Sequence, residues 1–256
     1  MGSLDLIRQA LDTVSAGGKA AIATVVRTDR SVPRRIGAAM LIRDDGSRSG
    51  TVGGGEMESR VVDMAVEAMA DGHPRLLTYR LVDPSTGDPG VCGGEMDVYV
   101  EPYMNTASLL IIGAGHVGRA VCELAQWTGW DVHLWDDRSE QLEELDDVIN
   151  SYDGELSEVL ADIPLDARSA IVMVTRNVPL DVELIPEVVK QPAAYIGLMG
   201  SARRWSTTKK LLIDAGCSEN ELSRISTPIG LEIGAETPEQ IAISIMAEVV
   251  RATSTR

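Results

Sequence analysis

Residues 109 to 118 read LLIIGAGHVG, and this stretch constrains the fold more than any other part of the chain. Four apolar residues, typical of a buried strand, come before Gly113, Gly115 and Gly118 at G-x-G-x-x-G spacing. The first glycine permits a tight turn, the second lets a pyrophosphate approach the backbone, and the third lets helix and strand pack closely. Residues 119–128 predict a helix, whose first N–H groups would face the phosphates. The pattern predicts a Rossmann-like unit that binds a dinucleotide.

A second predicted strand, DVHLW, ends in two acidic residues about 20 positions further on, where an acid hydrogen-bonds ribose hydroxyls. Asp136 favours NAD over NADP, whereas Arg138 keeps NADP possible. Thr175 follows the predicted strand SAIVMV, at the carboxyl end of the sheet where ligands bind. The expected cofactor-binding residues of this half are Gly113, Gly115, His116, Val117, Gly118, Asp136, Asp137, Arg138 and Thr175.

The two halves of the chain differ in their patterns. Residues 1–104 predict a small α+β domain with an opening helix, several strands and a helix over Glu56 to Asp71. Residues 105–256 alternate strands and helices, which predicts an open, mostly parallel, doubly wound sheet. A third strand of this sheet is expected near 147–150. The fold class is therefore α/β, with a Rossmann-like C-terminal domain and a smaller N-terminal one.

Two loops of the N-terminal half have compositions that suit anions. Gly53 and Gly54 belong to a run of three glycines at the start of a predicted helix. Ordering three glycines costs conformational entropy, and the close approach of a phosphate-like ligand to the backbone would explain why they are there. Glu56 follows as a candidate acid or base, with stabilisation of the helix dipole as the simpler alternative. Arg34 and Arg35 lie in a loop after Pro33 and suit bidentate anion binding, unless they are a solvated surface pair.

The three cysteines have no metal-ligand spacing, and no metal site is expected. Cys92 lies in GVCGGEMD, where glycines leave it uncrowded and backbone N–H groups favour a thiolate, so it is the candidate reactive thiol. The alternative is a small residue in a tight turn. Cys122, on the apolar side of the first Rossmann helix, is expected in the core, and Cys217 is expected to be inert.

The net charge of −16 argues against nucleic acid as a partner. No apolar run reaches the roughly 18 residues of a membrane span. The N-terminus is polar and does not resemble a signal peptide, which predicts a cytoplasmic protein with reduced thiols.

Several motifs together resemble the XdhC/CoxI family, accessory proteins of xanthine dehydrogenase and carbon monoxide dehydrogenase. The resemblance covers nearly the whole chain: SVPRRIGAAML, GTVGGGEMES and VCGGEMDVYVEP in the first half, and IIGAGHVGRAV, WDDR, YIGLMGSARR and PIGLEIGAETPEQIAISIMAE in the second. It implies a small N-terminal domain plus a Rossmann domain, often as a dimer. The cysteine of the family's C-G-G motif corresponds to Cys92.

The resemblance implies a protein that binds molybdenum cofactor, assists its sulfuration and inserts it into a molybdenum hydroxylase of the xanthine dehydrogenase type. The expected partners are that hydroxylase, a cysteine desulfurase and a second copy of the chain. One motif departs from the family: Thr175-Arg176-Asn177 stands where members commonly carry Thr-His-Asp, which puts the role of that loop in doubt.

Two other classes of function stay open. The first is an NAD(P)-dependent oxidoreductase acting on a small anionic substrate. Arg34, Arg35 and Arg176 would then grip a carboxylate, and Glu56 or Cys92 would supply acid–base chemistry. The second is an interaction scaffold with a vestigial nucleotide fold. The sequence leaves the choice between molybdenum cofactor and NAD(P) unresolved.

Overall fold

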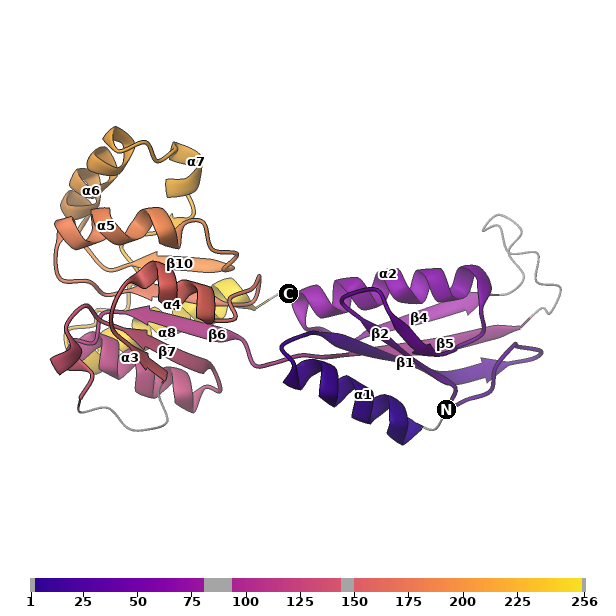
Figure 1. Ribbon diagram of the computed structural model, residues 1–256. Coiled ribbons are helices and arrows are strands. Elements are labelled where there is room, and N and C mark those ends of the chain that lie inside the picture. Colours follow the sequence, from indigo (N-terminus) through magenta and orange to yellow (C-terminus); the bar gives the residue numbers. More distant parts are fainter. Residues whose placement is uncertain (1–2, 81–93, 144–149, 255–256) are drawn as a thin grey trace. The chain divides into compact units, whose positions relative to one another are not determined.

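A computed structural model describes residues 3–80, 94–143 and 150–254. It divides into two compact units, Met1–Asn105 and Thr106–Arg256, joined by the segment between the last strand of one sheet and the first strand of the other. The two units are drawn in Figure 1. Each has its own sheet and its own apolar core, so each is described by itself.

The N-terminal unit is an antiparallel sheet of five strands in the order β3-β2-β1-β5-β4. Helices cover it on its two faces. The helix α2 packs Met57, Val61 and Ala65 against one face, and α1 packs Leu6 and Ala10 against the other. The elements are α1 (Ser3–Ser15), β1 (Ala20–Asp29), β2 (Ala39–Arg43), β3 (Arg48–Gly50), α2 (Gly55–Asp71), β4 (Arg75–Arg80) and β5 (Glu95–Tyr103).

The C-terminal unit is a parallel sheet of six strands in the order β11-β10-β9-β6-β7-β8. This confirms the predicted Rossmann-like sheet. All five residues of β6 are buried, as a strand between two helical layers requires. The strands are β6 (Ser108–Ile112), β7 (Asp131–Trp135), β8 (Asn150–Tyr152), β9 (Ala170–Met173), β10 (Tyr195–Leu198) and β11 (Ile225–Ser226). Residues 147–149 of the expected third strand lie outside the described residues.

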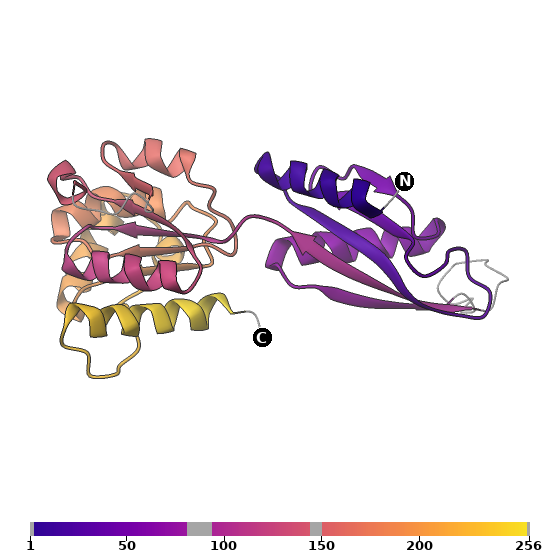
Figure 2. The same cartoon turned by 90° about the horizontal axis from the view of Figure 1, so that it is seen from below.

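Helices cover both faces of this sheet. On one face α3 and α8 lie side by side and share a core that includes Val121, Ala125, Ile245 and Val249, as Figure 2 shows from below. On the other face α4, α5 and α6 enclose a second core. The helices are α3 (His116–Trp127), α4 (Leu156–Asp162), α5 (Val178–Val188), α6 (Ala202–Asp214), α7 (Glu219–Leu222) and α8 (Pro238–Thr253).

The last helix begins as its sequence predicts. Thr237 caps it by accepting a hydrogen bond from the backbone N–H of Gln240, Gln240 completes the capping box, and Pro238 occupies the first turn. Because all six strands of the sheet are parallel, the loops that follow them meet at one edge, and the candidate site lies there.

Candidate functional site

The three fingerprint glycines have three different steric environments. Gly113 has φ +117°, and a Cβ there would lie 2.8 Å from the carbonyl oxygen of Val174. A Cβ at Gly118 would lie 1.8 Å from the carbonyl oxygen of Gly113, so helix and turn pack too closely for any side chain. A Cβ at Gly115 would meet nothing within 4 Å. The backbone is therefore open to a ligand at the position where a pyrophosphate is expected to approach.

The start of α3 has no side-chain cap. Its N-cap is Gly115, whereas α5, α6 and α8 are capped by the side chains of Asn177, Ser201 and Thr237. The first N–H groups of an α-helix have no partner within the helix and carry partial positive charge. In α3 these groups stay available for an anion beside Gly115.

A pocket of about 210 Å³ opens at this point, between the carboxyl ends of β6, β7 and β9. It is lined by two fingerprint glycines and by the residues that follow β7 and β9. The predicted residues that it brings together are Gly113, Gly115, Asp136, Asp137, Arg138 and Thr175. His116, Val117 and Gly118 do not line it: the first is exposed at the helix start and the last is buried against the turn.

Asp136 is buried and engaged within the protein. The residue is 1% exposed, and its Oδ2 accepts hydrogen bonds from the backbone N–H of Ala114 at 2.7 Å and from Nη2 of Arg138 at 3.0 Å. Its Oδ1 accepts from the backbone N–H and Nε of Arg138 at 3.0 and 2.9 Å. The hydrogen bonds from the guanidinium group to Asp136 raise the pKa of Arg138. A ribose hydroxyl would have to compete with all four donors for Asp136, so its role as the ribose acceptor stays a prediction.

A second ion pair lies at the mouth of the same pocket. Both terminal nitrogens of Arg176 donate to the carboxylate of Asp137 at 2.6 Å. The hydrogen bond from Arg176 lowers the pKa of Asp137. Asp137 follows β7 and Arg176 follows β9, and β6 lies between these two strands, so the pair passes over the end of β6 beside the fingerprint turn. The arginine of the atypical Thr-Arg-Asn loop therefore contributes an ion pair to the pocket wall.

The Thr-Arg-Asn loop is held by a buried carboxylate that sequence reasoning did not single out. Asp181 is fully buried and receives two hydrogen bonds from Arg204, both at 2.8 Å, and one from the hydroxyl of Thr175. Arg204 also donates to the carbonyl oxygen of Thr175 at 3.0 Å, and Asn177 caps α5. Arg204 belongs to the motif YIGLMGSARR, so its place in a family motif was the sequence signal that could have pointed to it. Thr175 is thus a fixed wall of the pocket.

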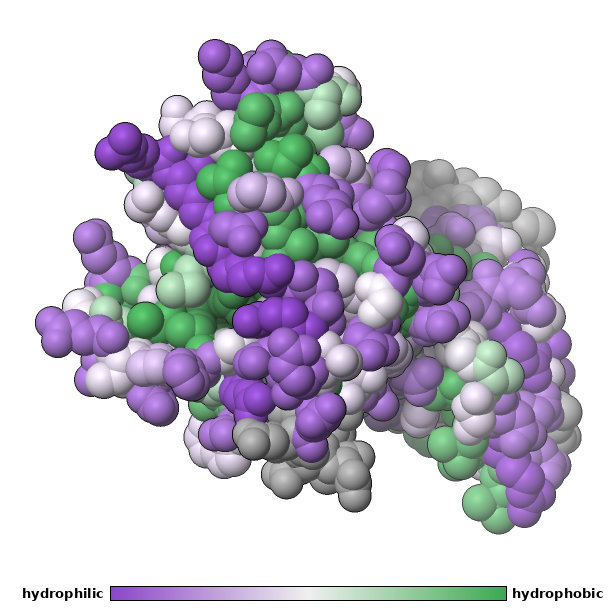
Figure 3. Space-filling model, turned by 60° about the vertical axis from the view of Figure 1, so that its left-hand side comes forward, coloured by the Kyte–Doolittle hydropathy of each residue, from purple (hydrophilic) through white to green (hydrophobic). Residues whose placement is uncertain are grey.

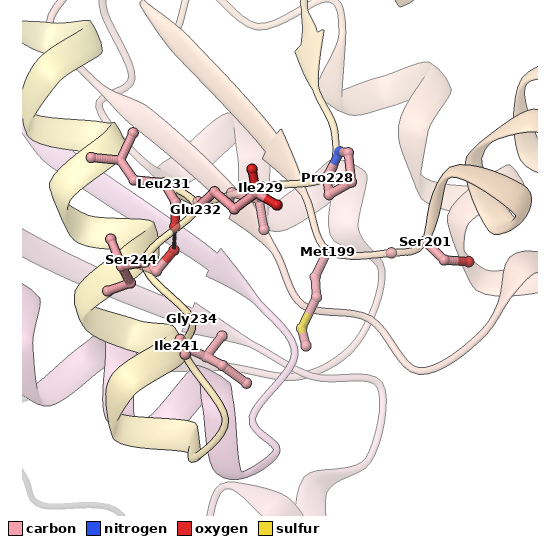
Figure 4. Close-up of a pocket in the computed structure, with 13 residues that line it drawn as sticks. Met199, Ser201, Pro228, Ile229, Leu231, Glu232, Gly234, Ile241 and Ser244 are labelled. Atoms are coloured by element: carbon pink, nitrogen blue, oxygen red, sulfur yellow. Dashed lines mark hydrogen bonds between the residues drawn. The ribbon is translucent and has the colours of Figure 1, made fainter.

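A larger pocket of about 650 Å³ lies further along the same edge and was missed by the sequence reasoning. It is formed by residues 199–201 after β10, by residues 228–235 after β11, and by Ile241 and Ser244 of α8. Figure 4 shows Met199 and Ile241 pointing toward each other across it. Figure 3 views the side on which the strands of this sheet end and shows apolar surface between bands of hydrophilic residues. Both segments belong to family motifs quoted above, YIGLMGSARR and PIGLEIGAETPEQ.

In the N-terminal unit the glycine loop already binds an anion of its own chain. Oε1 of Glu58 accepts hydrogen bonds from the backbone N–H groups of Val52, Gly53 and Gly54 at 3.2, 3.4 and 3.0 Å, and from the hydroxyl of Thr51. Burial raises the pKa of Glu58, but these hydrogen bonds outweigh it and hold the pKa below its ordinary value. An external phosphate would have to displace Glu58 to reach the two glycines.

Backbone conformation also explains the three consecutive glycines. Gly53, Gly54 and Gly55 have φ values of +152°, +84° and +65°, which other residues rarely adopt. A Cβ at Gly53 would lie 2.6 Å from the terminal methyl of Met57 and 2.9 Å from Pro33. The glycines are therefore needed for the shape of the loop, whether or not a ligand approaches it.

The other predicted residues of this unit lie on its surface. Glu56 pairs with Arg60 one turn along α2, at 2.5 Å. Arg34 and Arg35 are exposed and pair with no acidic residue of the described part of the chain. Arg34 borders a small pocket of about 310 Å³ with Gly37 and Thr51, so it lies near the glycine loop. Their contact with a ligand stays a prediction.

The two described cysteines have no reactive environment. Cys122 is fully buried, as predicted, and burial raises the pKa of its thiol to about 12. Burial also raises the pKa of Cys217. Cys92 lies outside the described residues. Among the residues with described side chains there is no group of three or more metal-ligating side chains that could hold an ion, and no described helix is long and apolar enough to cross a membrane.

The fold defines a protein of two units, one of which has a Rossmann-like sheet with a pocket at the carboxyl edge of its strands. Comparison with protein families identifies it further. A family model described as the XdhC Rossmann domain matches residues 109–249, more than half of the chain, and one described as the XdhC and CoxI family matches residues 13–80. The chain therefore belongs to the XdhC and CoxI family.

Known proteins support this assignment. The chain is 35% identical to YqeB of Escherichia coli K12 over 90% of its own length and 43% of YqeB. It is 23% identical to the molybdenum cofactor insertion chaperone PaoD of the same organism, over 95% of this chain and 86% of PaoD. It is 32% identical to a probable xanthine dehydrogenase subunit of Bacillus subtilis, over 60% of this chain and 46% of that protein. The chain spans less than half the length of the first and third of these relatives.

A solved structure confirms the fold. The crystal structure of a xanthine dehydrogenase from Bacillus halodurans matches with a TM-score of 0.50 and 20% identity, and the match covers 98% of this chain and 96% of the other. At this level of identity the likeness concerns the fold alone.

Proposed function

We propose that this protein binds molybdenum cofactor and inserts it into a molybdenum hydroxylase of the xanthine dehydrogenase type. The observation that carries the proposal is the pocket beside Gly115, where an uncapped helix start meets open backbone. Molybdopterin carries a phosphate, and its nucleotide form carries a pyrophosphate, which suit such a site. The likeness to the insertion chaperone PaoD, which extends over 95% of this chain, supports the same ligand.

The chain's own residues have distinct parts in this proposal. The N–H groups at the start of α3 bind the phosphates. Arg138 and Arg176 offer guanidinium groups to the ligand, and each is held in place by an aspartate partner that balances its charge. In the N-terminal unit, Arg34 and the amides of Gly53 and Gly54 offer a second anion site, provided that the cofactor displaces Glu58.

The finer parts of the proposal concern sulfur and assembly. Cys92 holds the sulfur or metal of the cofactor, since its glycine neighbours in the sequence favour a thiolate and a thiolate suits both. A cysteine desulfurase supplies the sulfur for sulfuration, and the protein works as a homodimer in the cytoplasm. Each of these steps needs its own test, because none follows from binding alone.

Delivery of the cofactor tests the proposal directly. The protein, loaded with molybdenum cofactor, is mixed with a cofactor-free molybdenum hydroxylase, and the recovered hydroxylase activity is measured. We expect recovery from the wild type and loss of recovery with Gly115→Trp, because the indole blocks the backbone. Gly115→Ala is the matched control: φ is −70° there, and its methyl group enters open space.

The same assay separates the proposal from its alternative. A wild-type protein that delivers no cofactor, yet binds NAD(P) and transfers hydride to or from a small anion, would be an oxidoreductase. That outcome would replace the proposal. Equal delivery by the wild type and Gly115→Trp would keep the function and move the site away from the fingerprint.

A further inference from the structure

The large pocket at the ends of β10 and β11 is built as a fixed cavity. Ser244 of α8 donates to the carbonyl oxygen of Leu231 at 2.5 Å and accepts from the backbone N–H of Leu231, through its own carbonyl oxygen, at 3.1 Å. Glu248, one turn further along α8, accepts from the backbone N–H of Gly230 and from the hydroxyl of Ser226 at 2.9 Å. The loop 228–235 is thus tied to α8 at Gly230 and Leu231, in its middle, and this attachment limits the reorganisation that the cavity needs to receive a ligand.

The walls of this cavity are mostly apolar, with the hydroxyls of Ser201 and Ser244 and one charged residue, which is exposed. Met199, Ile229 and Ile241 supply apolar surface from three different elements of the wall. Glu232 is the only charged residue among those that line it. In the part of the chain that the structure describes, no hydrogen bond or ion pair engages the Glu232 side chain. Apolar walls with a few polar groups that fix orientation are typical of sites for small organic ligands.

The position of Glu232 restricts which ligand fits. A carboxylate only accepts hydrogen bonds, so its complement carries N–H donors. Two neighbouring donors on one edge of a flat ring match its two oxygens, as the fork of an arginine does. The apolar side chains of the walls would cover the two faces of such a ring and remove them from water. An amino-substituted fused heterocycle meets both requirements, and an aminopyrimidinone edge, as in a pterin, provides the two neighbouring N–H groups.

The two pockets of this edge are placed to hold one extended ligand. The smaller pocket is centred on β6, and the larger lies between β10 and β11, with β9 between them in the sheet. Since neighbouring strands are about 4.8 Å apart, the pockets are separated by between two and three spacings, about 10–14 Å. A diphosphate linker at the start of α3 can therefore place a nucleoside over β7 and a second ring toward β10.

We propose that the pocket formed by residues 199–201, residues 228–235 and Ile241 binds the pterin ring of the cofactor, with Glu232 accepting hydrogen bonds from its amino edge. This assignment rests on the proposed function, and it specifies where the pterin half of the ligand binds. The nicotinamide of NAD is a flat ring with a single carboxamide donor, and it satisfies one carboxylate oxygen rather than two.

The test uses 2-amino-4-oxopteridine, whose own fluorescence reports its binding to the full chain. Glu232→Gln should weaken binding about tenfold, the effect of losing a hydrogen bond to a charged group. Ile241→Trp should abolish it by filling the cavity. The matched controls are Glu236→Gln, directly after this loop, and Ile243→Trp on the same helix, where the native residue is 53% exposed and outside the pocket. Thermal unfolding followed by circular dichroism checks that each variant folds.

Each outcome decides the proposal. Selective loss with Glu232→Gln and Ile241→Trp supports it. Equal pterin binding by all folded variants, or no pterin binding by a wild type that still delivers molybdenum cofactor, overturns the pocket assignment and leaves the function standing. Failure of the wild type to bind the cofactor at all overturns the function instead. Competition of NAD⁺ for the bound pterin would assign the pocket to a nicotinamide ring.

Discussion

Removing the carboxylate of Glu58 tests whether the glycine loop of the N-terminal unit is held by its own chain. The structure gives Glu58 three backbone N–H donors and one hydroxyl donor on a single oxygen. Hydrogen bonds to charged groups contribute about 1.5–3 kcal/mol, and partial exposure of the loop lets water replace part of this. We expect Glu58→Gln to cost about 1 kcal/mol and Glu58→Ala about 2 kcal/mol in the free energy of unfolding.

The chain provides a way to measure this unit separately. All four tryptophans lie in the C-terminal unit, at positions 127, 130, 135 and 205. Urea unfolding followed by tryptophan fluorescence therefore reports that unit, and circular dichroism reports both. The Glu58 variants should shift only the transition that fluorescence does not see. Asp63→Ala, at an exposed position of the same helix, is the control.

The effect should depend on pH with a definite sign. The folded pKa of Glu58 lies below its ordinary value of 4.5, so its ionised form stabilises the folded state above the unfolded pKa. That contribution disappears as the pH falls through the folded value. The difference in stability between wild type and Glu58→Gln should thus be constant near neutrality and shrink in acid. A difference that is absent, or that does not change with pH, would refute the reasoning.

Phosphate gives the Glu58→Ala variant a further use. If the loop can take an external anion, phosphate should restore stability to Glu58→Ala and leave the wild type unchanged, because binding to the folded state alone stabilises it. No restoration would mean that the amides of Gly53 and Gly54 serve only the internal carboxylate.

Three other predictions concern the C-terminal unit. Gly118→Ala should lower the melting temperature, because its Cβ would lie 1.8 Å from the carbonyl oxygen of Gly113; an unchanged thermal transition would contradict the packing described. Asp181→Ala should cost about 3–5 kcal/mol in urea unfolding, because it leaves the partly buried Arg204 without its carboxylate; a cost below about 1 kcal/mol would show that this pair holds little. Cys122, with a pKa of about 12, should resist thiol labelling near neutral pH in the folded protein, and labelling as fast as in urea would disprove its burial.

The Rossmann-like unit could be predicted because its signals are local. The run of apolar residues in β6, the spacing of Gly113, Gly115 and Gly118, and the cap at Thr237 each depend on neighbours in the sequence. The short strand β3 (Arg48–Gly50) was not predicted, because three residues with little apolar content carry no periodic signal.

Side-chain directions and contacts between distant segments limited the prediction of the site. Nothing near Glu58 in the sequence says that its carboxylate turns back onto the glycine loop. Likewise, Asp136 has the expected spacing from the fingerprint, but spacing alone does not reveal that Arg138 covers its carboxylate. The large pocket joins two loops about 30 residues apart with a helix, so its residues become neighbours only once β10 and β11 pair.

Retention of the cofactor tests the central claim most directly. The purified wild type is equilibrated with the released nucleotide form of molybdenum cofactor and, in a parallel sample, with NAD⁺, and the free ligand is then removed by gel filtration. Molybdenum is measured by mass spectrometry, and pterin by the fluorescence of its oxidised derivative. We predict that molybdenum and pterin stay with the wild type in equal amounts and are lost with Gly115→Trp. Retention of NAD⁺ without any pterin or molybdenum would contradict the account.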